Sequence, residues 1–227
     1  MSIFKPYRYY RKEAIEYQAN NVLRRMAQRG DQFAPCWPFD VTLVADFFDL
    51  GVIWERIPPD EQGAIAARIL PLQRCIEINE EILDKPQGFQ ESTLAHEIGH
   101  WVLHINHEAT RETGDRLITD LTPAADEPFV CRGSREVNSP LNHASVLESM
   151  EWQAQYFAGC LLMPRLILEE KRQGRDLTQW SHLYEMREEL GVSISNLVNR
   201  LQDLEWIYLD KKTRKRDIYP GRALLVS

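Results

Sequence analysis

Positions 96 to 100 read His96-Glu97-Ile98-Gly99-His100. On an α-helix, two histidines four residues apart project from the same face, close enough to bind one metal ion. The glutamate that follows the first histidine has the place of a general base in zinc hydrolases. The five residues therefore predict a catalytic zinc site, around which the rest of the chain is interpreted.

A helix over residues 93–105 would divide the side chains of this segment into two faces. Leucine, isoleucine, valine and tryptophan fall on one face, while both motif histidines, Glu97 and His104 fall on the other. Gly99 inside this helix costs about 1 kcal/mol relative to alanine. We interpret that cost as a sign that another backbone approaches the helix at Gly99.

Length, charge and cysteine content restrict the class of protein. The 227 residues suffice for one sizeable core, or for a compact catalytic domain with a small appendage. The formal charge of −7 argues against a main role in binding nucleic acid or an anionic membrane. The four cysteines form no Cys-x-x-Cys pair, and no signal peptide or membrane span is evident. We therefore expect a reduced, cytoplasmic protein that does not enter a membrane.

Periodicity divides the chain into an N-terminal arm at residues 1–11, a catalytic domain at 12–165 and a C-terminal unit at 166–227. The expected fold class is α+β, with a small antiparallel sheet, an active-site helix and a second helix that supplies a metal ligand. The elements expected before the motif are helices at 12–29 and 41–50 and strands at 52–57, 64–70 and 74–79.

Two segments of the catalytic domain have two interpretations each. The strand near residues 76–79 is either an exposed edge that pairs with an extended substrate or an ordinary core strand. Residues 106–142 are polar, contain three prolines and lack a strong period. They form either a rim or lid of the site or a disordered surface insertion.

A helix over residues 145–163 supplies the third candidate ligand. Glu151 falls inside its apolar face, where a carboxylate needs a strong partner, and a metal ion would be one. Two histidines and one glutamate form an established catalytic zinc set. Glu148, outside the apolar face, and a third histidine remain competitors, although Leu103 and Asn106 occupy the positions of the glycine and histidine in the three-histidine pattern. The expected apolar face consists of Val146, Leu147, Met150, Ala154, Phe157, Ala158 and Leu161.

Two segments resemble the signatures of ImmA/IrrE-type metallopeptidases. The first runs from Phe89 to His100 and continues with Leu103-His104. The second contains a glutamate at 151, an alanine three residues later, Phe-Ala, and then Leu-Leu-Met-Pro ending at Pro164. The resemblance extends over residues 12–165. It departs from the pattern at Gln155, where asparagine is common, and in the greater length of the 106–142 segment.

The resemblance implies a zincin-like fold in which His96, His100 and Glu151 bind Zn²⁺ and Glu97 is the catalytic base. It also implies a substrate, because known members cleave helix-turn-helix repressors of the Xre type and thereby relieve repression.

Four further residues are candidates for supporting roles. His104 and Gln155 are candidates for the second shell of the metal; His104 would orient Glu151 or a ligand histidine, or would only pack. His143 and Tyr156 are candidates for stabilising the oxyanion, each with a structural role as the alternative.

The C-terminal unit is expected to contain two helices, at 177–190 and 194–204, then a strand at 206–209 and a basic run at 211–216. This order predicts a helix-turn-helix or winged-helix-like unit. Acidic residues on both helices favour packing or partner docking over DNA contact.

Two classes of function therefore remain. The favoured one is a zinc endopeptidase that acts on a repressor. The alternative is a non-proteolytic regulator whose metal site is structural or inactive and which binds protein or DNA. The sequence carries no signal for an oligomeric state.

Overall fold

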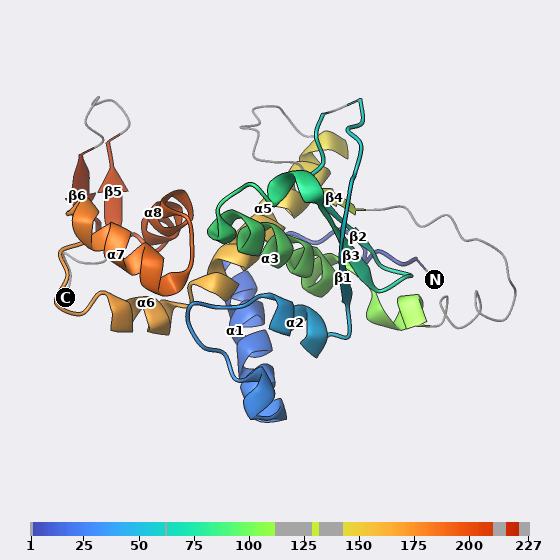
Figure 1. Ribbon diagram of the computed structural model, residues 1–227, viewed down its shortest axis with the longest axis horizontal. Helices are drawn as coiled ribbons and strands as arrows, with labels where there is room; N and C mark the ends of the chain where they lie inside the picture. The colour runs from blue at the N-terminus through green and yellow to red at the C-terminus, as the bar shows by residue number, and fades with distance from the viewer. Residues whose placement is uncertain (1, 62, 112–128, 132–142, 211–216, 223–227) are drawn as a thin grey trace, which may run out of the picture.

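The computed structural model describes residues 2–61, 63–111, 129–131, 143–210 and 217–222 (Figure 1). This part of the chain has a mixed α+β fold. Its helices are α1 (Lys12–Arg29), α2 (Thr42–Phe47), α3 (Gln87–His104), α5 (His143–Leu162), α6 (Arg165–Lys171), α7 (Trp180–Leu190) and α8 (Ile194–Asp203). Its strands are β1 (Gly51–Glu55), β2 (Ala67–Leu70), β3 (Cys75–Asn79), β4 (Phe129–Cys131), β5 (Ile207–Leu209) and β6 (Ile218–Pro220).

The larger sheet has the strand order β1-β3-β2-β4 and is mixed. Strand β2 is antiparallel to β3 and β4, but β1 is parallel to β3. The prediction of an antiparallel sheet is therefore wrong for one pairing. A short turn connects β2 to the antiparallel strand β3. Strand β3 lies between β2 and β1 and runs in the same direction as β1.

This strand order also decides between the two interpretations of residues 76–79. Strand β3 is interior, and Ile76, Ile78 and Asn79 are buried, so it is a core strand and not an exposed edge. In the described sheet the edges are β1 and β4. Strand β4 comes from the 106–142 segment, where the sequence showed no strand pattern. The other prediction for this segment was a rim or lid of the site, or a surface insertion. It concerns residues 112–128 and 132–142, which are outside the described residues.

Helix α1 has the predicted bounds because its apolar residues recur at helical spacing and Gly30 follows with φ 137°. Helix α2 is shorter than the predicted 41–50. Val41 is its N-cap, and Asp40, one residue earlier, accepts a hydrogen bond from the backbone N–H of Thr42 at 2.9 Å. Gly51 does not end this helix; it begins β1.

Helix α3 begins at Gln87, six residues before the expected start, directly after Pro86. Gly88 in its first turn lies against the loop between α7 and α8. A Cβ at Gly88 would be 2.7 Å from the backbone nitrogen of Ser193, so only glycine permits this approach. The N-terminus of α3 is thus packed on the C-terminal unit.

Residues of the N-terminal arm pair with the chain that leaves α3. Phe4 forms a bridge with Ile105, and the backbone N–H of Lys5 donates to the carbonyl of His104 at 2.9 Å. The arm therefore covers the C-terminal end of the helix that carries both motif histidines.

Helices α3 and α5 pack closely on each other between the sheet and the C-terminal unit (Figure 1). The buried face of α5 includes Ala154, Phe157, Ala158 and Leu161 as predicted, but Leu147 is 54% exposed. Among the described residues, no helix is both long enough and apolar enough to cross a membrane.

The C-terminal unit consists of α6, α7, α8 and the β5–β6 hairpin, at the opposite end of the molecule from the larger sheet (Figure 1). Helix α7 ends at Gly191 with φ 70°, and the Ser193 hydroxyl caps α8 by accepting from the N–H of Asn196 at 3.1 Å. The predicted basic run at 211–216 is outside the described residues.

Candidate metal centre

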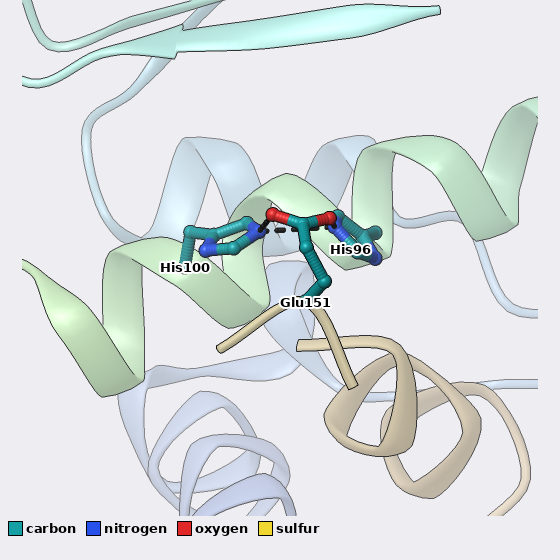
Figure 2. Close-up of side chains that lie close together, drawn as sticks. All are labelled: His96, His100 and Glu151. Atoms are coloured by element: carbon teal, nitrogen blue, oxygen red, sulfur yellow. Dashed lines mark hydrogen bonds and ion pairs between the residues drawn. The ribbon is translucent and has the colours of Figure 1, made fainter. Parts of the chain in front are cut away.

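The ligand atoms of His96, His100 and Glu151 converge at one point between α3 and α5 (Figure 2). The Nε2 atoms of the two histidines are 3.0 Å apart. The Glu151 carboxylate spans them, with one oxygen 3.1 Å from His96 Nε2 and the other 3.3 Å from His100 Nε2. These three residues could therefore hold a metal ion.

The separations match the ligands of a single small ion. In a tetrahedral zinc site with bonds of about 2.0–2.1 Å, neighbouring ligand atoms are about 3.3 Å apart. The three measured separations lie between 3.0 and 3.3 Å. Two imidazoles and one carboxylate also suit zinc chemically and leave a fourth position for water or substrate.

Gly99 explains how Glu151 reaches the histidines. A Cβ at Gly99 would lie 2.9 Å from the carbonyl oxygen of Ala154 and 3.0 Å from its Cα. The two helix backbones are therefore nearly in contact, as the glycine in the motif predicted. Because Glu151 precedes Ala154 by about one turn of α5, this contact places its carboxylate beside both imidazoles.

The site also keeps His100 and Glu151 in the protonation states that a metal requires. Burial lowers the pKa of His100 to about 4, so its imidazole is neutral at pH 7. Burial alone would raise the pKa of Glu151, but hydrogen bonds from His100 and His96 outweigh it and hold the pKa well below its ordinary value. Neutral histidines and an ionised glutamate are the ligand forms.

His104 lies behind His100, one helical turn further along α3. The Nδ1 atoms of the two rings are 3.0 Å apart. A partner at Nδ1 fixes the ring and leaves Nε2 directed at the metal position. Of the predicted roles of His104, this contact favours the one in which it orients the ligand His100. Burial lowers the pKa of His104 to about 3.

Gln153, which sequence reasoning missed, supports His104 in turn. Its side chain is fully buried, and its interaction with His104 raises the pKa of that imidazole against the effect of burial. Its amide nitrogen also donates to the Ser149 hydroxyl at 3.2 Å. A signal was present, because Gln153 lies only about 40° around the helix from Phe157, inside the apolar face.

Glu97 is fully buried in α3, next to His96. It is about 60° around the helix from His100, on the same side as the metal ligands. It is not one of the three residues whose ligand atoms converge. A carboxylate beside the ligands but outside the ligand set has the place of a general base.

The structure places two of the three remaining candidates, Gln155 and Tyr156. Gln155 is exposed and lines a cleft beside the site, so Gln153 takes the supporting place for which Gln155 was a candidate. Tyr156 lies about 140° around α5 from Glu151, and its hydroxyl accepts a hydrogen bond from Arg200 at 3.3 Å. Tyr156 is thus held away from the metal ligands, in a structural role. The side chain of His143 is outside the described residues.

Comparison with known proteins found likeness to solved structures. No family model and no curated protein matches the sequence. A solved structure of a Mycobacterium tuberculosis transcriptional regulator is similar with a TM-score of 0.47 and 16% sequence identity. The similarity covers 92% of this chain and 52% of that protein, so the chain spans about half the length of the regulator.

Proposed function

We propose that this protein is a zinc-dependent endopeptidase in which His96, His100 and Glu151 bind the ion and Glu97 is the general base. The observation that carries the proposal is the convergence of three zinc-type ligand atoms from α3 and α5. The buried Glu97 beside them separates this arrangement from a purely structural zinc site, which has no use for a buried carboxylate outside its ligand set.

Each residue has a role that follows from its chemistry. A zinc ion held by these three residues would lower the pKa of its bound water toward about 7 and polarise the scissile carbonyl. Glu97 accepts the proton of the attacking water and can then deliver it to the departing amine. His104 and Gln153 hold the His100 ring in its ligand orientation.

The substrate class comes from the resemblance to ImmA/IrrE-type metallopeptidases, whose known members cleave Xre-type repressors. The two signature segments contain all four residues to which we assign binding or catalysis. The proposed zincin-like fold rests on the same two segments, which form α3 and α5.

The proposal is tested by co-expressing the protein with each Xre-type repressor encoded nearby and following cleavage by mass spectrometry. Cleavage should require zinc. Glu97→Gln should lower the rate by about 10²–10⁴-fold, because it removes the proton acceptor and leaves the ligands intact. Its zinc content should stay at that of the wild type.

Glu108→Gln is the matched control, since Glu108 is an exposed acid beyond the end of α3. Equal rates for Glu97→Gln and Glu108→Gln would disprove the assignment of the base. A zinc-loaded wild type that cleaves none of the repressors and no unfolded protein would favour the non-proteolytic regulator.

A further inference from the structure

A polar cleft of about 410 Å³ lies between α5 and α8. Its volume is in the range of ligand-binding pockets, roughly 300–1,000 Å³. The residues that matter for its chemistry are Ser92, Trp152, Gln155, Asn196, Asn199 and Gln202. The catalytic helices supply the first three of these, and α8 of the C-terminal unit supplies the others.

The cleft begins next to the metal centre. Ser92 precedes His96 by four residues on α3, and Gln155 follows Glu151 by four residues on α5. Four residues correspond to about one helical turn, or roughly 5–6 Å. Along both helices, therefore, the cleft opens about one turn from the metal ligands.

The charged groups of the cleft are already paired within the protein. Arg200 binds Glu16 at 2.7 Å, and Asp203 binds Lys12 at 2.5 Å. This balance offers little to a phosphate or to another strongly charged ligand. The side-chain amides of the cleft can both donate and accept hydrogen bonds, like the backbone of an extended peptide.

An aromatic surface forms part of the cleft lining. Trp152 is 38% exposed and stacks on Tyr156, with ring centroids 5.6 Å apart, and on Tyr9 of the arm, with centroids 6.3 Å apart. These two contacts hold the indole in place, and its exposed part is an apolar surface on which one side chain of a ligand can pack.

The position of α8 argues against duplex DNA as the occupant. In a helix-turn-helix, the second helix enters the major groove with its polar face outward. Here Asn196, Asn199 and Gln202 of α8 line a cleft whose other wall includes Trp152 and Gln155 of α5. A duplex is too wide for this space, whereas a single extended polypeptide chain can enter it.

From these observations we infer that the cleft binds an extended, uncharged polar segment of the polypeptide substrate, a few residues from the scissile bond. The inference rests on the proposed peptidase function. One turn of helix spans about two extended residues, so the contacts should begin about two residues from the cleaved bond and continue on one side of it.

The test uses the zinc-loaded full chain and peptides from a whole-cell tryptic digest, with cleavage sites identified by mass spectrometry. The double variant Gln155→Ala/Asn199→Ala removes one amide from each wall. The control is Asn20→Ala/Gln28→Ala, which removes two exposed helical amides from α1. Zinc content and circular dichroism should be the same in all three proteins.

We expect wild type and control to share a residue preference on one side of the scissile bond, and the double variant to lose it. For the best-cleaved peptide, resynthesised, the double variant should raise KM by about 5–100-fold, the effect of two lost hydrogen bonds, and should largely keep kcat. The same preference and KM in the double variant and the control would overturn the inference.

A second measurement separates this inference from the function on which it rests. If the zinc-loaded wild type cleaves no peptide, the proposed function fails. Retention of the same peptides by immobilised Glu97→Gln protein, and its loss when Gln155→Ala/Asn199→Ala is added, would still support a peptide-binding cleft. No retention by Glu97→Gln would overturn it.

Discussion

Helix α5 carries two polar clusters that differ in their charge balance. On one side, Glu151 meets His96 and His100. On another, Tyr156 meets Arg200, whose side chain is only 2% exposed and also binds Glu16 and, at 3.2 Å, the carbonyl of Met163. The Arg200 cluster contains its own cation, with acceptors arranged around it.

The cluster of His96, His100 and Glu151 differs from the Arg200 cluster, because none of its three residues carries a fixed positive charge. Its lone pairs converge at the separations that a metal ion requires. The comparison teaches that a buried polar cluster with an internal cation serves packing, here the attachment of α8 to α1 and α5. A cluster of ligand atoms without a fixed cation could instead hold an ion from solution.

The largest expected effect is on metal retention. Glu151→Gln should weaken zinc binding by more than about 100-fold, beyond the 10–100-fold typical of residues behind the ligands. Competition with a chromophoric chelator measures this affinity. Glu148→Gln, one turn earlier on α5, should bind zinc like the wild type. If Glu148→Gln loses the metal and Glu151→Gln keeps it, the ligand assignment is wrong.

The second effect is on stability and leaves the metal in place. Arg200→Met should lower the free energy of unfolding by about 3–5 kcal/mol, because it leaves Glu16 without its buried partner. Urea unfolding at fixed zinc concentration measures this loss, and Arg200→Met/Glu16→Leu should recover most of it.

The partly exposed Lys12–Asp203 pair supplies the control for this prediction. Asp203→Asn should change stability by no more than about 1 kcal/mol. If Arg200→Met costs no more than Asp203→Asn, the Arg200 cluster does not hold the C-terminal unit to the core.

The smallest effect concerns the packing of α3 against α5 at Gly99, which also positions the candidate metal ligands. Gly99→Ala should destabilise the protein by about 1–3 kcal/mol, since its Cβ would press on Ala154 and push α5 away from α3. The same displacement moves Glu151 from the histidines, so zinc affinity should fall as well. Chemical unfolding and chelator competition measure the two effects.

Gly159→Ala is the matched control, because the nearest atom to its new Cβ is 4.0 Å away. It should raise stability by up to about 1 kcal/mol, the difference in helix propensity. A stabilised Gly99→Ala with unchanged zinc affinity would show that the close contact is not required for the site.

Elements with a strong local pattern were predictable. Helix α1 has the predicted bounds, and the histidines of α3 share a face because four residues complete about one helical turn. The structure departs from prediction where pairing is not local. The expected antiparallel sheet contains a parallel pairing of β1 with β3, and Glu77 of β3 is buried and paired with Arg68 of β2.

By itself, the sequence determined the part of the candidate site that one helix contains: His96, Glu97 and His100, whose relative directions follow from helical geometry. Glu151 lies 55 residues from His96, and its preference over Glu148 rested on an apolar face and a family resemblance. Only the tertiary structure brings its carboxylate to the imidazoles, through the contact of Gly99 with Ala154.

The same division holds for the C-terminal unit. Its two helices followed from periodicity, but the face that α8 turns toward α5 depends on buried contacts such as Arg200 with Glu16, which are 184 residues apart. Backbone hydrogen bonding and side-chain spacing act within a few residues and can be inferred from the sequence. Which surfaces meet depends on packing between distant segments, and the cleft beside the metal centre exists only as a result of that packing.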